Sequence, residues 1–214
     1  MAGALDFKKA YPDLYLPKAK PALIDVPAMT FIAVDGEGDP NEEDGSFSRA
    51  VDLLYGLSYT IKMSKMGGRA PDGYYEYVVP PLEGLWRTKS GAPGELDLLH
   101  KDEFVFTAMI RQPEFVTQAV FDAAGETVLK KKGLDPAGAR LMSYAEGLSV
   151  QCMHLGPYDA EPATMARMYA FIEENGLAAD YSDARRHHEI YLGDPRKTAP
   201  EKLRTVLRIP VRRA

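Results

Sequence analysis

The sequence of 214 residues contains one cysteine, Cys152, and one tryptophan, Trp86. A single cysteine excludes an internal disulfide framework and any zinc site built from several cysteines. No apolar run approaches the roughly 18 residues that a membrane-spanning helix needs, so we expect no membrane partner. The first ten residues carry Asp6, Lys8 and Lys9 but no apolar stretch, so we expect no secretory signal and predict a cytoplasmic location.

Positive charge is also scarce. The chain has 26 Lys and Arg residues against 31 Asp and Glu residues, which gives a formal net charge of -5. Proteins that bind duplex nucleic acid neutralise phosphates with a dense basic surface, whereas the basic clusters here are limited to 130–132, 185–186 and 212–213. We therefore expect no nucleic-acid partner.

Several common catalytic signatures are missing as well. The sequence has no Walker loop and no nucleophile elbow, and the stretch 36–38 lacks the third glycine of a dinucleotide fingerprint. The four histidines are scattered, and the adjacent pair His187 and His188 would point to opposite faces of a strand. Neither a metal nor a cofactor is expected.

The pattern of elements predicts an α+β fold made of two similar halves. Each half reads as strand, helix and further strands, and Gly38 and Gly156 hold matching places after the first strand. A turn near 146–147 separates two expected strands of the second half. Strands are expected at 28–35, 74–79, 84–88, 103–110, 139–144, 147–155, 187–192 and 203–211, and helices at 46–65, 113–131 and 162–174.

The domain organisation follows from this order. Prolines interrupt every candidate element in residues 1–27, which we interpret as an N-terminal arm. Residues 28–214 form a single domain whose halves, about 28–112 and 139–211, are joined by a helix at 113–132. A pseudo-twofold antiparallel sheet of this kind would border a central ligand cleft where the halves meet.

The strand expected at 187–192 carries both a carboxylate and a phenol. Residues two apart on a strand share a face, so His187, Glu189 and Tyr191 are expected on one side. The other face, which begins with His188, is more apolar and is expected to pack under the helices. A carboxylate in a groove walled by Trp86 and tyrosines favours flat or cationic ligands.

Five segments resemble the GyrI-like small-molecule-binding family, in its stand-alone form. The C-terminal segment 187–211 is similar to the family's signature, and 151–162 and 81–86 are similar to two further blocks. Segments 106–113 and 130–133 fit the same subfamily. The resemblance implies duplicated βαββ repeats, as in GyrI-like and SOUL-like proteins, around a central ligand cleft.

The resemblance also implies an activity, because some stand-alone members are cyclopropanoid cyclopropyl hydrolases that open the cyclopropane of DNA-alkylating compounds in an aromatic cage. Trp86 matches the tryptophan of one block, and Glu189 and Tyr191 match the Glu-x-Tyr block. Glu146 is a second candidate for the carboxylate that activates water. The remaining expected ligand-binding residues are Tyr75, Tyr77, Phe104, Phe106, His154 and Tyr169.

Three functions stay open from the sequence. The first is a hydrolase for cyclopropane-bearing alkylators that protects the cell from these xenobiotics. The second is a module that sequesters lipophilic or cationic drugs without turnover, and the third is a gyrase-inhibitor-like interaction protein. The expected partner is a small planar aromatic or cationic ligand, and the chain is expected to be a monomer or homodimer.

Overall fold

A computed structural model describes residues 3–68, 70–91, 94 and 96–214, so the first two residues of the predicted arm lie outside it. Six strands follow the order β4-β1-β3-β2-β6-β7, and β7 pairs back with β4, so the antiparallel sheet closes on itself. The strands are β1 (Ala22–Glu37), β2 (Leu82–Thr88), β3 (Phe104–Arg111), β4 (Ala139–Leu155), β6 (His187–Tyr191) and β7 (Arg204–Arg213), with the short β5 (Leu177–Ala179) added on β7.

The predicted duplication is confirmed. The first repeat is β1-α3-β2-β3 and the second is β4-α5-β6-β7. Gly38 and Gly156 each follow the first strand of a repeat, with φ of 113° and 123°. Their amides make matching hydrogen bonds, to the carbonyl of Phe104 at 2.9 Å and to that of Leu203 at 3.0 Å. Both positions need the left-handed backbone that glycine adopts without strain.

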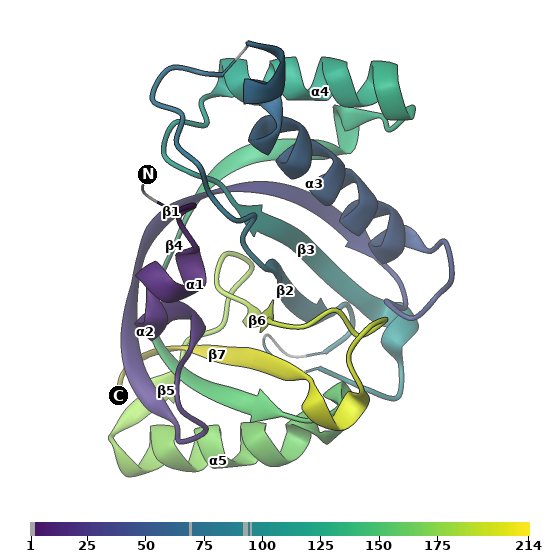
Figure 1. Cartoon of the computed structure of the whole chain (residues 1–214). Helices are drawn as coiled ribbons and strands as arrows, with labels where there is room; N and C mark the ends of the chain where they lie inside the picture. Colours follow the sequence, from purple (N-terminus) through teal and green to yellow (C-terminus); the bar gives the residue numbers. More distant parts are fainter. Residues whose placement is uncertain (1–2, 69, 92–93, 95) are drawn as a thin grey trace.

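The helices lie on opposite sides of the closed sheet. In Figure 1, α3 and α4 lie above the strands and α5 lies below them. Met168 and Ile172 of α5 are buried against Val150 and Leu207 of the strands that this helix covers, as expected for an amphipathic helix on a sheet. Among the described residues, no helix is both long and apolar enough to cross a membrane. The helices are α1 (Phe7–Ala10), α2 (Pro12–Tyr15), α3 (Ser46–Lys62), α4 (Gln118–Lys132) and α5 (Glu161–Glu174).

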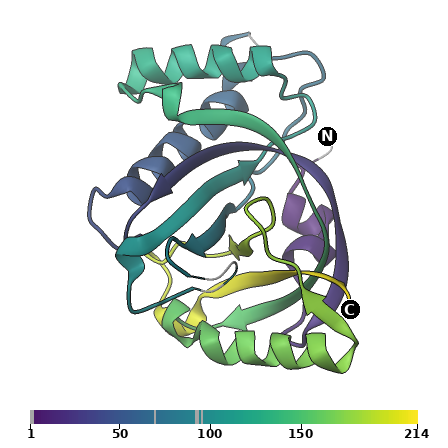
Figure 2. The same ribbon diagram turned by 180° about the vertical axis from the view of Figure 1, so that it is seen from behind.

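Two long strands, β1 and β4, join the repeats. They keep one register from Ala22 opposite Gln151 to Val34 opposite Ala139, and Figure 2 shows them running side by side. The prediction of two strands with a turn near 146–147 is therefore wrong. Gly147 has a positive φ of 70°, but the pairing with β1 continues on both sides of it, so the chain does not turn.

Other predicted bounds also change. The strand expected at 74–79 is wrong, because Tyr77 makes only an isolated bridge with Leu5. The helix expected from Pro113 begins at Gln118, after the N-cap Thr117, whose hydroxyl accepts a hydrogen bond from an amide of the first turn. Strand β1 begins at Ala22, so it includes the last residues of the segment interpreted as an arm.

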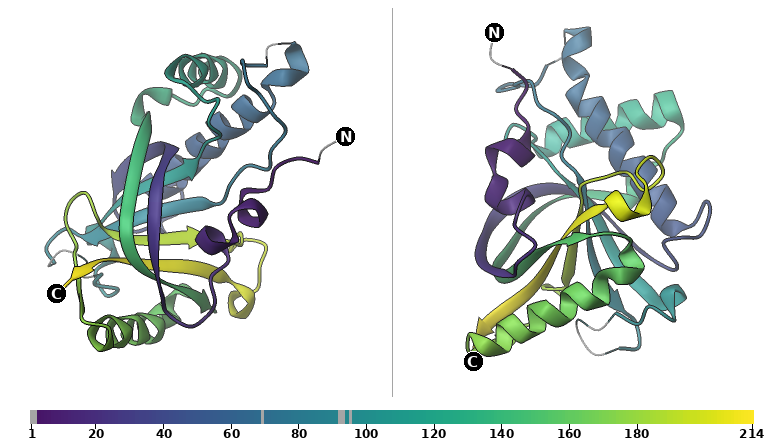
Figure 3. Two further views of the ribbon diagram at one scale, coloured as in Figure 1. Left: turned by 90° about the vertical axis from the view of Figure 1, so that its left-hand side faces the viewer. Right: turned by 60° about the horizontal axis from the view of Figure 1, so that its bottom comes forward.

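The N-terminal segment packs through a few buried side chains. Phe7, Leu14 and Tyr15 are buried, and Figure 3 shows α1 and α2 alongside the strands. The guanidinium group of Arg111 on β3 lies 4.7 Å from the ring centre of Phe7 and 4.5 Å from that of Tyr11. These cation–π contacts attach the segment to the face of β3 that carries Arg111.

Candidate functional site

A chain of hydrogen bonds links three predicted site residues. The indole Nε1 of Trp86 on β2 donates to the hydroxyl of Tyr191 on β6 at 2.8 Å, and that hydroxyl donates to Oε2 of Glu189 at 2.8 Å. His187 lies on the same face, with Nε2 3.2 Å from Oε1 of Glu189. The predicted alternation on β6 is confirmed. Burial first and then Glu189 raise the pKa of Tyr191 well above its usual value, so the phenol stays neutral.

Aromatic rings surround Trp86 on the other side. Phe104 and Phe106 of β3 lie 5.8 and 5.6 Å from its ring centre. Phe47 of α3, which sequence reasoning missed, lies 5.1 Å away. Tyr158 meets the ring of Tyr191 edge-on at 5.8 Å. An apolar wall therefore stands beside the polar chain, and the indole itself is only 4% exposed.

Gly84 makes room for this arrangement. It pairs with Glu189 across β2 and β6, and the indole of Trp86 lies over its backbone. A Cβ at this position would overlap Nε1 of Trp86 and lie 3.2 Å from the hydroxyl of Tyr191. Only glycine therefore lets tryptophan reach the tyrosine here.

We expect Gly84→Ala to push the indole away from Tyr191 and to lower the free energy of unfolding by about 1–3 kcal/mol, as overpacking typically does. Because Trp86 is the only tryptophan, its emission spectrum reports the displacement directly. Gly138→Ala is the matched control, since a Cβ at Gly138 would meet nothing within 4 Å. An unchanged emission maximum and unchanged stability in Gly84→Ala would contradict this account.

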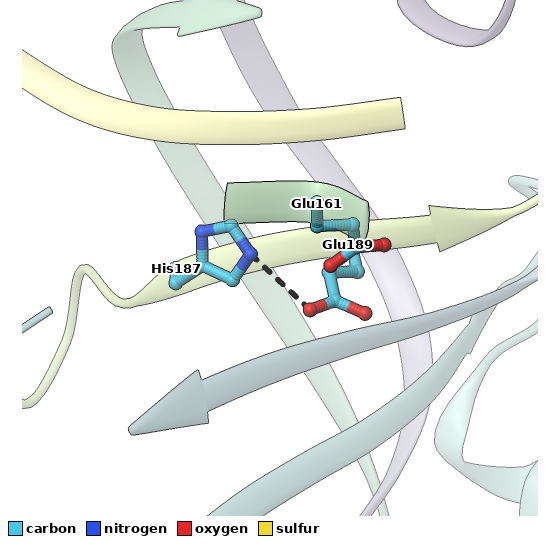
Figure 4. A group of neighbouring side chains, drawn as sticks. All are labelled: Glu161, His187 and Glu189. Carbon is cyan, nitrogen blue, oxygen red and sulfur yellow. Dashed lines mark ion pairs between the residues drawn. The ribbon is translucent and has the colours of Figure 1, made fainter. Parts of the chain in front are cut away.

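A second carboxyl group joins the site from α5. Glu161 lies in the first turn of that helix, and Figure 4 shows it beside His187 and Glu189. One ligand atom from each of the three lies within 4.8 Å of the others. Burial first and then Glu189 raise the pKa of Glu161 well above its usual value, which favours the protonated form of this carboxyl group. Glu161 is distant in sequence from β6 and stands in no motif, so no local pattern identifies it.

Glu146 lies on the other face of β6. Its Oε2 lies 2.9 Å from Nδ1 of His188 and accepts a hydrogen bond from Arg208 at 3.1 Å. The second ring nitrogen of His188 lies 3.0 Å from Oε2 of Glu83. From the sequence, this face is expected to be the more apolar one, and Ile190 does pack in the hydrophobic core, but four buried polar side chains also meet there. Since His188 and Glu189 are successive strand residues, Glu146 is not brought to Trp86.

Charge stabilises this buried network. Burial alone would raise the pKa of Glu146, but His188 and Arg208 outweigh burial and lower it to about 2. Burial alone would lower the pKa of His188, but Glu146 and Glu83 outweigh burial and raise it to about 9. At neutral pH the network therefore holds a charged imidazolium of His188 and the guanidinium of Arg208 beside the carboxylate of Glu146.

We expect the free energy of unfolding to fall as pH rises from 6.5, the ordinary pKa of histidine, through about 9. Between these values the folded protein keeps a proton on His188 that the unfolded chain has released, so raising pH favours unfolding. Urea denaturation across this range checks the slope. His188→Gln should flatten it, whereas His100→Gln, which removes an exposed imidazole, should leave most of it. A flat profile in the parent protein would contradict the assignment.

The remaining predicted ligand-binding residues lie away from Trp86. Tyr75 and Tyr77 pack around Phe115, beside the N-terminal segment. His154 is buried under α5, where its Nδ1 lies 3.0 Å from the hydroxyl of Thr164. Tyr169 is 41% exposed on α5. The structure thus brings together Trp86, Phe104, Phe106, Glu189 and Tyr191, and does not bring Tyr75, Tyr77, Glu146, His154 or Tyr169 into that group.

Two cavities in the described part of the chain lie away from Trp86 and Glu189. One, of about 60 Å³, lies between Arg87 and Arg186. The other, of about 400 Å³, lies beside α5 and includes Phe171. Trp86 and Glu189 are both buried, so the central cleft expected from the sequence is not open to solvent at these two residues.

Comparison with known proteins identifies the family. The GyrI-like small molecule binding domain matches residues 19–212. The chain belongs to the GyrI-like family. No curated protein matches it.

GyrI-like proteins of known structure share the whole fold. An uncharacterized conserved protein from Listeria innocua is 48% identical, with a TM-score of 0.91, over 97% of this chain and 100% of that chain. Two proteins from the same organism described as hydrolases are 45% and 46% identical, with TM-scores of 0.88 and 0.90. These alignments cover 97% and 98% of this chain, and 100% of each neighbour. The GyrI-like assignment thus covers both repeats and the face that carries Trp86.

Proposed function

We propose that this GyrI-like protein is a hydrolase that opens the cyclopropane of DNA-alkylating compounds, with Glu189 as the base. The observation that supports this most is the buried Trp86–Tyr191–Glu189 chain with the buried carboxyl group of Glu161, whose pKa is raised, beside it. Two similar proteins described as hydrolases agree with an enzymatic role. The uncharged aromatic side chains around Trp86 suit a flat, lipophilic substrate.

The reaction needs little machinery, because opening a cyclopropane conjugated to a cyclohexadienone produces an aromatic phenol. A water molecule held by Oε1 of Glu189 attacks the cyclopropane methylene carbon, and Glu189 takes the water proton. The carbon–carbon bond that breaks gives its electron pair to the ring, which becomes a phenolate. Glu161 donates its proton to the oxygen where this charge develops. One water is added overall, and proton exchange with solvent restores both carboxyl groups.

Each neighbouring residue has a distinct part in this proposal. Tyr191 holds Oε2 of Glu189 by its 2.8 Å hydrogen bond and so orients Oε1. Trp86 fixes the hydroxyl of Tyr191 and, with Phe104 and Phe106, offers ring faces and edges for stacking. Stacking places the substrate carbon near the water, which lowers the entropic cost of the reaction.

The test uses a cyclopropane-bearing alkylator with its ring conjugated to a dienone, mixed with substoichiometric protein. Mass spectrometry should show full conversion to the water adduct, and titration should quench the emission of Trp86. Stoichiometric retention of the intact compound would overturn the hydrolase in favour of a sequestering module. If neither conversion of the compound nor quenching of Trp86 emission is observed, the proposal of ligand binding at Trp86 is overturned as well.

A further inference from the structure

The group formed by Glu161, His187 and Glu189 lacks a lysine or arginine among the described residues to balance its two carboxyl groups. Two carboxyl groups lie together in the interior, each 8% exposed, and no lysine or arginine of the described chain forms an ion pair with either. Burying carboxylates without a compensating cation is costly.

His187 is the second unusual member. Its side chain is 1% exposed, and neither ring nitrogen has a hydrogen-bond partner. Nε2 points toward Oε1 of Glu189 at 3.2 Å, as the dashed line in Figure 4 shows, although the geometry is not that of a hydrogen bond. Oε1 of Glu161 is likewise buried without a partner. Buried polar atoms are nearly always satisfied, so unpaired atoms in a group whose ligand atoms lie within 4.8 Å of one another indicate a missing ligand.

We propose that Glu161, His187 and Glu189 bind a divalent first-row transition-metal ion, and that Zn²⁺ binds more tightly than Mn²⁺. One imidazole nitrogen and two carboxylate oxygens are a donor set typical of such ions, and this order of affinity follows the general series for divalent metals. The two positive charges of the ion balance the two carboxylates that bind it.

The surrounding geometry favours this site. The three ligand atoms lie within 4.8 Å of one another, and bonds of about 2.0–2.2 Å to one ion require only small side-chain rotations. Oε2 of Glu189 is already held by Tyr191, which leaves Oε1 for the ion. Hydrogen bonds of this kind from outside the ligand set orient metal-binding carboxylates. The ion would occupy the oxygen that holds water in the proposed hydrolysis and would replace the proton of Glu161, so the metal-bound group is a state separate from the hydrolytic one, and its binding does not depend on that activity.

The test needs no substrate. Untagged protein freed of metal with EDTA is titrated with Co²⁺, followed by its visible absorption, and the Co²⁺ is then displaced with Zn²⁺ and, separately, with Mn²⁺. We expect one Co²⁺ per chain, displaced by one Zn²⁺ and less readily by Mn²⁺. His187→Gln should weaken binding by about 100-fold or more, since even residues outside the ligand set contribute about 10–100-fold.

Two further variants make the result decisive. Glu161→Gln should weaken metal binding as strongly as His187→Gln. If the histidine variant does not fold, Glu161→Gln alone tests the site. His100→Gln removes an exposed imidazole and should leave the affinity unchanged. Absence of a Co²⁺ spectrum, or an affinity that Glu161→Gln leaves unchanged, would overturn the proposal. Because the readout is metal binding, failure here and failure of the hydrolase assay are separate results.

Discussion

Glu189→Gln should lower turnover of a cyclopropane-bearing alkylator by about 10²–10⁴-fold, the usual contribution of a positioned general base. Glutamine keeps the shape of the side chain and can still accept the hydrogen bond from Tyr191, so affinity should change little. The loss should therefore appear in kcat rather than in KM. Product formation measured by mass spectrometry gives kcat, and quenching of Trp86 emission gives affinity.

The controls for this prediction separate chemistry from folding. Glu174→Gln removes an exposed carboxylate at the end of α5 and should leave turnover unchanged. The thermal unfolding of Glu189→Gln shows whether the fold persists. Parent-like turnover in the folded Glu189→Gln variant would remove Glu189 from the mechanism, and the water would then need another base.

Arg208→Met should lower the free energy of unfolding by about 3–5 kcal/mol, the cost of removing one partner from a buried ion pair. The side chain of Arg208 is fully buried. Its guanidinium donates to Glu146 at 3.1 Å, to the amide oxygen of Gln151 at 3.3 Å and to the carbonyl of Leu14 at 2.6 Å. Methionine fills a similar volume but removes the hydrogen bonds that Arg208 donates to these three acceptors. Such a loss is a large part of the roughly 5–15 kcal/mol that stabilises most domains.

Urea denaturation followed by the emission of Trp86 measures this change. Arg204→Met lies on the same strand but is exposed, so it should cost less than about 0.5 kcal/mol. Arg208→Lys keeps the charge with fewer donors and should give an intermediate loss, which keeps the test valid if the methionine variant does not fold. A free energy of unfolding within 0.5 kcal/mol of the parent for Arg208→Met would show that the network is not important for stability.

The sequence predicts the repeat and one face of the site well, because both depend on local patterns. The period of two along a strand places His187, Glu189 and Tyr191 together, and the structure joins them within 3.2 Å. The matching glycines after β1 and β4 mark equivalent turns, and both turns adopt the same backbone conformation. Such features need no knowledge of distant contacts.

Other parts of the site are beyond local patterns. Glu161 and Phe47 reach Trp86 and Glu189 from helices, and only the packing of those helices on the closed sheet brings them there. Tyr75 and Tyr77 alternate as strand residues do, yet the segment finds only Leu5 as a bridging partner and its rings pack on Phe115. Alternation therefore predicts which residues share a face only where a neighbouring strand completes the ladder.

His188 shows the same limit for charge. The face that begins with His188 is expected to be the more apolar one, yet Glu83, Glu146 and Arg208 of three other strands gather around this histidine. Only the closure of β7 onto β4 places them around one imidazole. The buried network is thus a property of the closed sheet rather than of any segment.

The continuous pairing of six strands constrains how quickly the protein can accept a ligand. Because β7 pairs back with β4, no hinge separates the two repeats, and they cannot swing apart without breaking a ladder of hydrogen bonds. A ligand that binds at Trp86, as we propose, must therefore enter by local opening, because this side chain is buried. Association should then be limited by this gating motion and be slow relative to diffusion.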